Sequence, residues 1–375
     1  MKKLVYLLLL SFGSVNANAQ VTEHLISNFK KLKSISYIES TKTKDFFSEA
    51  IFTDTVIHKI SFQPTLAFQF TGKKQDDIFD GNKLFKLNLS DSTYRLTNEF
   101  KSSIYYYNSL PFLVDLLEKD IKKGAKVTQL RDSVYEGKLY FKIKVTDLDS
   151  IKDGKKVSSH TTYLVDKKTY LPHYYRNDSQ GFIDGTNIHL IIFREYHFSN
   201  YKINTTDLSS LSSLILPTYF SLEKPKVKKP MLEKGMVAPN VKLVALDGKQ
   251  TELSTYRNSI VLLNFTENGC PHCVVSVEML NRLNLKYKNQ PFKIISINAF
   301  DDHDSIVKFN NKFKVNYPIF MISKDPLASY NIEGYPTFYL IDQKGEIVKG
   351  YLGFGENTEA QVTKDLDSLI SNGKP

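Results

Sequence analysis

Residues 21–221 alternate apolar and polar side chains with a period of two, most clearly in the runs 83–89 and 140–145. Such alternation is typical of strands that bury one face. Turn sequences rich in Asp and Gly separate the runs, as in Asp80-Gly81-Asn82, Asp153-Gly154 and Asp184-Gly185-Thr186. Helical patterns interrupt the strands at 22–31 and 111–122. The pattern therefore predicts a mostly antiparallel β domain with one or two helices.

A different pattern begins at Gly235. Short continuous apolar runs alternate with stretches of helical period, the runs being 259–265, 293–297 and 337–341. This alternation predicts an α/β domain with a mixed or parallel sheet. Between the two domains, prolines and lysines in residues 222–234 favour an extended, solvated linker. Two domains, 20–221 and 235–375, also agree with a length of 375 residues.

The first 19 residues have the composition of a signal peptide. Lys2 and Lys3 precede the apolar stretch 4–12, and Ala17-Asn18-Ala19 supplies the small residues of a cleavage site. An apolar stretch of about nine residues is too short to cross a bilayer, which takes about twenty. No Cys follows this stretch, so we expect no lipid anchor. The sequence predicts an exported protein, soluble after cleavage near Ala19 and periplasmic in a Gram-negative cell.

The formal net charge of +10 is spread along the chain. Its densest run, 224–229, lies in the predicted linker, and no motif that reads a nucleic-acid groove accompanies the charge. We therefore expect no nucleic-acid partner. The chain has 22 Tyr, 25 Phe and no Trp, and this abundance of aromatic residues favours extensive β-structure.

Candidate chemistry is concentrated in Cys270-Pro271-His272-Cys273, which holds both cysteines of the chain. An exported protein with structural disulfides would distribute its cysteines in several pairs. The apolar run 260–265 predicts a strand before the motif, residues 266–269 a loop, and Cys270 the start of a helix. Unpaired amides and the helix dipole favour a thiolate at that position. The motif therefore predicts a redox-active dithiol.

The two cysteines are expected to have different roles. Cys273 lies one helical turn after Cys270 and deeper in the predicted domain. We interpret Cys270 as the attacking thiol and Cys273 as the resolving thiol, which together form a redox disulfide. His272 would add a positive charge beside the Cys270 thiolate and favour an oxidising pair. Alternatively, His272 is an ordinary exposed helix residue.

Two other uses of the cysteine pair follow from its spacing. Zinc takes four ligands as a rule, and the sequence offers His303 as a loose third candidate beside the cysteines. A local disulfide without a redox role closes so short a loop that it contributes little stability. We expect neither a metal nor another cofactor.

Residues 235–375 resemble the TlpA/ResA-like branch of the thioredoxin superfamily. The matching stretches keep their order and spacing: 234–240, 246–248, 253–254, 261–265 ahead of the cysteines, and 333–342 followed by Gly345. The resemblance implies a thioredoxin fold and a thiol–disulfide oxidoreductase. It also implies that Pro336 is the catalytic cis-proline that faces the dithiol. Gly334, Tyr335 and Thr337 would then bind substrate by strand-like pairing.

Some positions depart from the family pattern. Gly269 stands where the family usually has Trp, and residues 274–276 lack the acid often found after the second Cys. Asn264 occupies the position of the buried Asp that accepts a proton in thioredoxins proper, as is common in this branch. Glu267 is a candidate substitute, and the alternative is that it is a solvated loop charge. The proton acceptor for Cys273 therefore stays open.

The N-terminal domain weakly resembles the LolA-like periplasmic fold, an incomplete β-barrel wrapped on helices. The likeness lies in the turn 80–81 before Leu84-Phe85 and in the segment 161–166 before Leu171-Pro172. It implies a groove that holds an acyl chain or an extended peptide, and the alternative is a structural platform. We interpret the histidines of the strand segments as structural or exposed, namely His160, His173, His189 and His197.

Two classes of function follow from these features. The leading hypothesis is a periplasmic thiol–disulfide oxidoreductase that exchanges protein disulfides and is served by a membrane or periplasmic electron-transfer partner. Most relatives of this branch reduce disulfides, whereas Pro271-His272 favours oxidation, so the direction stays open. The alternative is a periplasmic protein that binds lipid, lipoprotein or peptide and has an accessory thioredoxin module. A peroxidase is disfavoured because no Pro precedes Thr266.

Overall fold

The structure is a computed structural model that describes residues 13–44, 51–97, 109–183, 188–209, 211, 216–224 and 229–372. The chain divides into two compact units near residue 225. Residues 1–12 of the predicted signal peptide and residues 225–228 of the predicted linker lie outside the described residues. In the part of the chain that the structure describes, no helix has the length and apolar character needed to span a membrane.

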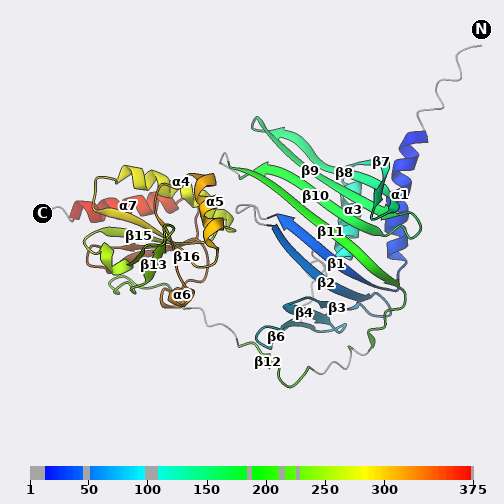
Figure 1. The fold of residues 1–375 in the computed structure, drawn as a ribbon, viewed down its shortest axis with the longest axis horizontal. Helices are drawn as coiled ribbons and strands as arrows, with labels where there is room; N and C mark the ends of the chain where they lie inside the picture. The colour runs from blue at the N-terminus through cyan, green and yellow to red at the C-terminus, as the bar shows by residue number, and fades with distance from the viewer. Residues whose placement is uncertain are drawn as a thin grey trace, which may run out of the picture. The chain divides into compact units, whose positions relative to one another are not determined.

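The N-terminal unit is built on one large sheet (Figure 1). Its strands are β1 (Ser34–Lys44), β2 (Ile51–Ser61), β3 (Ala67–Thr71), β4 (Gln75–Phe79), β5 (Leu84–Asn88), β6 (Thr93–Thr97), β7 (Lys126–Tyr135), β8 (Lys138–Lys152), β9 (Lys155–Asp166), β10 (Pro172–Phe182), β11 (His189–Ile203) and β12 (Ser221–Leu222). The runs of period two identified in the sequence lie in β5 and β8.

The order of the strands is β12-β6-β5-β4-β3-β2-β1-β11-β10-β9-β8-β7. Neighbouring strands are antiparallel except for β12 and β6, which are parallel. The expected antiparallel β domain is therefore present, with one short parallel strand at its edge. The likeness to the LolA-like fold stays a prediction.

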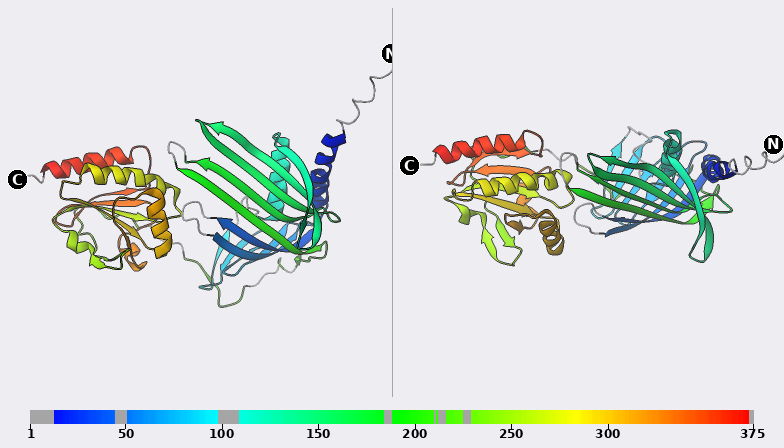
Figure 2. Two further views of the ribbon diagram at one scale, coloured as in Figure 1. Left: turned by 45° about the horizontal axis from the view of Figure 1, so that its top comes forward. Right: turned by 90° about the horizontal axis from the view of Figure 1, so that it is seen from above.

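Among the described residues, two helices lie against one face of this sheet (Figures 1 and 2). They are α1 (Gly13–Lys30) and α3 (Leu110–Lys122). The second matches the prediction for 111–122, whereas the first begins nine residues before the predicted 22–31. Helix α3 begins after Ser109 with a proline in its first turn, where a missing amide proton leaves nothing unpaired. Leu25 of α1 and Leu113 of α3 pack with Tyr37 and other strand residues in one core. Each such buried leucine stabilises the unit by about 1.5–3 kcal/mol.

The C-terminal unit has a seven-stranded sheet with helices on both faces. Its strands are β13 (Lys242–Ala245), β14 (Gln250–Glu252), β15 (Ile260–Thr266), β16 (Phe292–Asn298), β17 (Ile319–Met321), β18 (Thr337–Ile341) and β19 (Ile347–Leu352), in the order β14-β13-β17-β16-β15-β18-β19. Its helices are α4 (Pro271–Lys286), α5 (His303–Phe313), α6 (Asp325–Ser329), α7 (Thr358–Asn372) and the 3-10 helix η2 (Leu253–Tyr256).

The apolar residues of strand β15 (Ile260–Thr266) pack on both faces of the sheet, and its polar residues Asn264 and Thr266 are buried among them. Leu262 packs in the cluster with α4 and α7, which lie side by side in Figures 1 and 2. Leu263 and Phe265 pack in the cluster on the opposite face, with Tyr330. Because both faces of the strand are covered, no position is left for a polar side chain to reach water.

The parallel pairs β15–β16 and β16–β17 and the antiparallel pairs β15–β18 and β18–β19 form the centre and one edge of this sheet. The predicted mixed sheet is therefore present. Phe265 at the end of β15 lies opposite Thr337 at the start of β18. This register brings the loop that follows β15, which leads into α4, next to Pro336.

Candidate active site

Cys270 is the N-cap residue of α4, as the motif predicts. The backbone amide of Cys273 donates a hydrogen bond to the Cys270 sulfur over 3.2 Å. Both cysteines are free thiols, and they differ in access, because 8% of Cys270 and 1% of Cys273 is exposed to solvent. Cys270, the thiol nearer to the surface, is therefore the one whose sulfur accepts a hydrogen bond from a backbone amide of the helix.

The surroundings of the pair move the two pKa values in opposite directions. A hydrogen bond from the Cys273 thiol and the backbone amides of Cys273 and His272 lower the pKa of Cys270, against the opposing effects of burial and of Glu267. Burial, and then the neighbouring sulfur of Cys270, raise the pKa of Cys273 well above its ordinary range. The geometry therefore favours a thiolate on Cys270 and a protonated Cys273.

The resemblance predicts that Pro336 is a cis-proline close to the dithiol. The Tyr335–Pro336 peptide bond is cis. The Cys270 thiol donates a hydrogen bond to the carbonyl oxygen of Tyr335 over 3.4 Å. The backbone of Tyr335 thus lies directly beside the sulfur that we expect to react.

The other predicted site residues differ in how far they are exposed to solvent. Thr337 is 1% exposed, and its hydroxyl donates to the carbonyl oxygen of Gly334 over 2.7 Å. Its side chain therefore holds the turn before β18. Gly334 is partly exposed, and the side chain of His272 is exposed on α4. It is the backbone amide of His272 that acts on the Cys270 sulfur.

Polar residues surround the end of β15. Asn264 is 2% exposed and donates to the hydroxyl of Ser296 over 2.8 Å. The side-chain oxygen Oδ1 of Asn264 has no hydrogen-bond partner among the described residues. An amide cannot take the proton that a carboxylate would take at this position.

Glu267 lies in the loop between β15 and the cysteines and is partly buried, not freely solvated. Burial and the nearby carboxylate of Asp301 raise the pKa of Glu267. Asp301 is fixed by two donors, the backbone amide of Asn268 and the side-chain amide of Asn298, each at 2.8 Å. Glu267 is therefore an ionisable group held beside the dithiol by the fold.

The geometry also bears on the zinc alternative. Within the described ranges, no three metal-ligating side chains come together. Both ring nitrogens of His303 are within hydrogen-bond distance of other groups, the carboxylate of Asp304 and the carbonyl oxygen of Leu246, each at 3.0 Å. The ring of His303, at the start of α5, is thus engaged by these two groups and is not directed at the cysteines.

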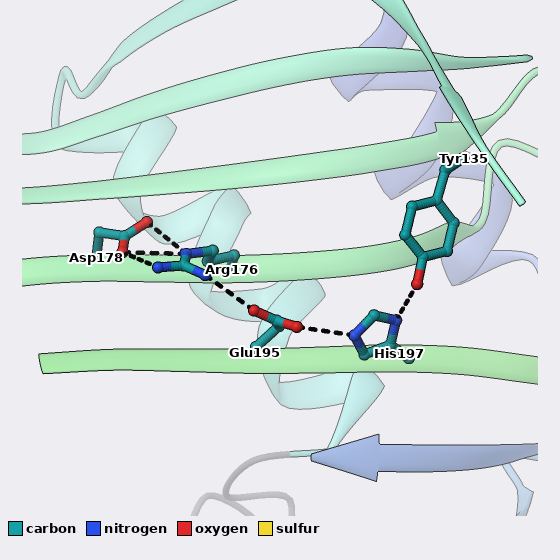
Figure 3. A network of polar contacts seen from close by, with 5 residues as sticks. All are labelled: Tyr135, Arg176, Asp178, Glu195 and His197. Carbon is teal, nitrogen blue, oxygen red and sulfur yellow. Dashed lines mark hydrogen bonds and ion pairs between the residues drawn. The ribbon is translucent and has the colours of Figure 1, made fainter. Parts of the chain in front are cut away.

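The strand histidines of the N-terminal unit also make structural contacts. Figure 3 shows His197 between the hydroxyl of Tyr135 and the carboxylate of Glu195, at 2.9 and 3.0 Å. Glu195 in turn pairs with Arg176, which binds Asp178. His160 lies 3.3 Å from the Thr146 hydroxyl, and His173 and His189 stack on Tyr140 and Phe182. These contacts explain the histidines without a catalytic role.

Sequence analysis missed one pair of polar residues, Glu39 and His58. Both are buried in the N-terminal unit, 3% and 4% exposed. The signal was present in the period of two: Glu39 lies on the face of β1 that carries Tyr37, and His58 on the face of β2 that carries Ile60. A polar residue on the apolar face of a strand is the unusual feature.

Comparison with known proteins agrees with this geometry. Residues 235–349 match the AhpC/TSA family. The thiol–disulfide oxidoreductase ResA of Geobacillus kaustophilus is 32% identical over 136 residues, which cover 36% of this chain and 77% of ResA. The thioredoxin-like protein YneN of Bacillus subtilis is 27% identical over 36% of this chain and 81% of YneN. The thioredoxin domain of a thiol–disulfide oxidoreductase from Bacteroides vulgatus is 27% identical, with a TM-score of 0.34, and covers 36% of this chain and 97% of that structure.

The sheet of the C-terminal unit, with a dithiol at the start of its first long helix, defines a thioredoxin-like enzyme that exchanges thiols and disulfides. The sequence identity with ResA extends over most of the length of ResA, and this narrows the class of enzyme further. Through its C-terminal part, the chain belongs to the ResA-like thiol–disulfide oxidoreductases of the AhpC/TSA family.

Proposed function

We propose that Cys270 and Cys273 are the redox-active pair and exchange disulfides of exported proteins. The observation that carries this proposal is the position of the Cys270 sulfur. It accepts the amide proton of Cys273 at the start of α4 and lies beside the carbonyl of Tyr335. The sulfur nearer to the surface has the lowered pKa and is the better nucleophile, and the protonated sulfur beneath it is kept for the second step.

In the reducing direction, the Cys270 thiolate attacks one sulfur of a substrate disulfide. A mixed disulfide forms, and the other substrate sulfur leaves as a thiolate that takes up a proton. Cys273 then loses its proton and attacks the Cys270 sulfur, which releases the second substrate thiol and leaves the Cys270–Cys273 disulfide. Two electrons pass from the dithiol to the substrate. The oxidising direction is the reverse of these steps.

The carbonyl of Tyr335 gives the substrate a second point of attachment. While Cys270 is a thiol, it donates to this oxygen. Once Cys270 is ionised it has no proton to donate, so the oxygen is free to accept an N–H from the backbone of the substrate. Extended peptides pair with exposed strand backbone in this way, and the role fits the backbone of Gly334 and Tyr335.

The direction of electron flow follows from the reduction potential of the pair. A potential near about −270 mV makes the protein a reductant, and one near about −120 mV makes it an oxidant. We place the protein in the periplasm, because residues 1–19 have the pattern of a signal peptide and both cysteines lie in one motif. A membrane or periplasmic electron-transfer partner then returns the dithiol to its working state.

Turnover of insulin disulfides by the full chain tests the proposal. Cys270→Ser should abolish turnover, and Cys273→Ser should trap a mixed disulfide between Cys270 and the substrate. Glu278→Gln, an exposed change on the same helix, serves as the control and should retain turnover. Undiminished turnover by Cys270→Ser would show that the reaction does not pass through this sulfur.

A further inference from the structure

The N-terminal unit contains a cavity of about 800 Å³. Its lining includes Glu39 of β1, His58 of β2, Phe70 of β3 and Tyr196 of β11. Tyr196 also belongs to the core beneath α1 and α3, so the cavity lies on the same face of the sheet as that core. Its volume falls in the range of about 300–1,000 Å³ that is usual for ligand sites.

Two buried polar side chains lie side by side in this lining. The carboxylate of Glu39 and the ring of His58 approach to 3.5 Å. No hydrogen bond joins them, and among the described residues Oε2 of Glu39 and both ring nitrogens of His58 have no hydrogen-bond partner. The His58 ring is held in place by a stacked Tyr37, with centroids 4.6 Å apart, and by Phe70 at 4.5 Å.

A fold rarely leaves buried polar atoms without partners, because their desolvation is then uncompensated. Here Oε2 of Glu39 and Nε2 of His58 face each other at 3.5 Å without a well-aligned hydrogen bond, Nδ1 of His58 has no partner among the described residues, and both side chains line one cavity. A bound group with hydrogen-bond donors would satisfy the carboxylate of Glu39, and a neutral His58 ring would take one donor and one acceptor. The arrangement is that of a binding site.

The rest of the lining is mostly polar, and it includes two further carboxylates, Asp54 of β2 and Asp77 of β4, the latter paired with Lys86 over 3.6 Å. Thr41 and Thr43 follow Glu39 on β1 at intervals of two, on the same face of the strand. Lys73 and Lys74, in the turn between β3 and β4, are also part of the lining and are exposed. Sites for acyl chains are predominantly apolar, so this cavity does not suit a lipid.

Register fixes the span between Glu39 and the exposed lysines of the turn between β3 and β4. Glu39 lies opposite Val56 on β2, and Ile57 lies opposite Thr71 at the end of β3. The turn with Lys73 is thus two strands away from Glu39, about 10 Å at the usual spacing of about 4.8 Å between strands. An extended tripeptide spans about 10 Å between its ends.

We propose that this cavity binds a short peptide with a free N-terminus. The ammonium group donates to the carboxylate of Glu39, and a backbone group of the peptide completes the hydrogen bonds of His58. The threonine hydroxyls bond to the peptide backbone, and the C-terminal carboxylate lies at Lys73 and Lys74. This site is independent of the dithiol and goes beyond the proposed exchange reaction.

Calorimetric titration of the full chain with triglycine tests this proposal. Triglycine should bind with one site per chain. N-acetyl-triglycine, which lacks the ammonium group, and triglycine amide, which lacks the carboxylate, should each bind at least about tenfold more weakly. Palmitate should not bind. Absence of triglycine binding at millimolar concentration, equal binding of the acetylated peptide, or binding of palmitate alone would overturn the proposal.

Substitutions locate the site within the unit. Glu39→Gln keeps the shape of the side chain and removes its charge, and it should weaken triglycine binding by at least about tenfold. The double change Lys73→Gln and Lys74→Gln lies in an exposed turn, so it tests the other end of the peptide in a chain that still folds. Asp149→Asn, an exposed change on β8, is the control and should leave binding unchanged. If the Glu39 variant and the double lysine variant both bound triglycine as tightly as the unaltered chain, the peptide would bind outside this cavity.

Discussion

The backbone amide of Cys273 donates a hydrogen bond to the sulfur of Cys270 over 3.2 Å, so the second cysteine of the motif stabilises the charge on the first. The thiol of Cys273 adds a further donor. Because a thiolate on Cys270 and the burial of Cys273 both disfavour a second charge, the two protons leave the pair in a fixed order. Cys270 is ionised first, and Cys273 stays protonated until its own attack.

The first prediction concerns the reactivity of the reduced pair. Iodoacetamide should alkylate Cys270 and leave Cys273 unmodified, since only thiolates react and Cys273 is buried with a raised pKa. The pH midpoint of the reaction should lie below that of a free cysteine, because the pKa of Cys270 is lowered. Mass spectrometry of the alkylated peptides at a series of pH values measures both.

Cys273→Ala provides the matched comparison for this reaction. It removes the thiol donor and keeps the backbone amide, so the alkylation midpoint of Cys270 should rise toward that of a free cysteine. An unchanged midpoint would show that the side chain of Cys273 has no part in stabilising the thiolate.

The second prediction concerns Glu267, whose charge opposes ionisation of Cys270. Glu267→Gln removes that charge, so the pKa of Cys270 should fall and alkylation should begin at lower pH than in the unaltered chain. Glu278→Gln, exposed on α4, should leave the midpoint where it is. A midpoint that rises in the Glu267 variant would mean that the carboxylate assists ionisation instead of opposing it.

The local features of the active site could be predicted from the sequence because they depend on neighbours in the chain. The apolar run before the motif, Pro271 in the first turn and the two cysteines place Cys270 at a helix start without knowledge of the rest of the fold. The run 337–341 coincides with β18 for the same reason. The cis peptide before Pro336 was predicted only through the family resemblance.

Other features depend on which distant segments meet. The pKa of Glu267 is raised partly because Asp301, which follows β16, lies beside it. Likewise, Glu39 and His58 define a cavity only once β1, β2 and β3 are paired. The pairing of these distant segments cannot be predicted from the pattern of neighbouring residues.

The third prediction tests the turn that precedes β18. Thr337→Val keeps the shape of the side chain and removes the donor to the Gly334 carbonyl, at a cost of about 1 kcal/mol in the free energy of unfolding. Insulin turnover should also fall, because Gly334 and Tyr335 lose their fixed position beside Cys270. Urea unfolding and turnover measure the two effects. Thr255→Val removes an exposed hydroxyl bond in the same unit and should leave turnover unchanged. If both variants lost turnover equally, Thr337 would have no specific role in positioning Gly334 and Tyr335.

The last prediction concerns the pH dependence of the N-terminal unit. Burial alone would raise the pKa of Asp166, but the ion pair with Lys138 and the backbone amides of Lys168 and Thr169 outweigh it and lower the pKa to about 2. The folded pKa thus lies below the unfolded value of about 3.9. The contribution of Asp166 to stability is therefore fully present above the unfolded pKa and is lost as the pH falls through about 2.

Asp166→Asn should accordingly lower the free energy of unfolding by about 1–2 kcal/mol at neutral pH, since solvent screens part of the ion pair. The difference between the two chains should shrink as the pH falls from about 4 toward about 2, where the carboxyl of the unaltered chain also becomes protonated. Urea unfolding followed by circular dichroism at several pH values measures this difference. Because Asp149 is exposed on β8 and solvent screens its pairing with Lys156, Asp149→Asn should show a smaller loss at neutral pH. A loss in Asp166→Asn that stays constant down to pH about 2 would mean that the turn depends on the shape of the side chain and not on its charge.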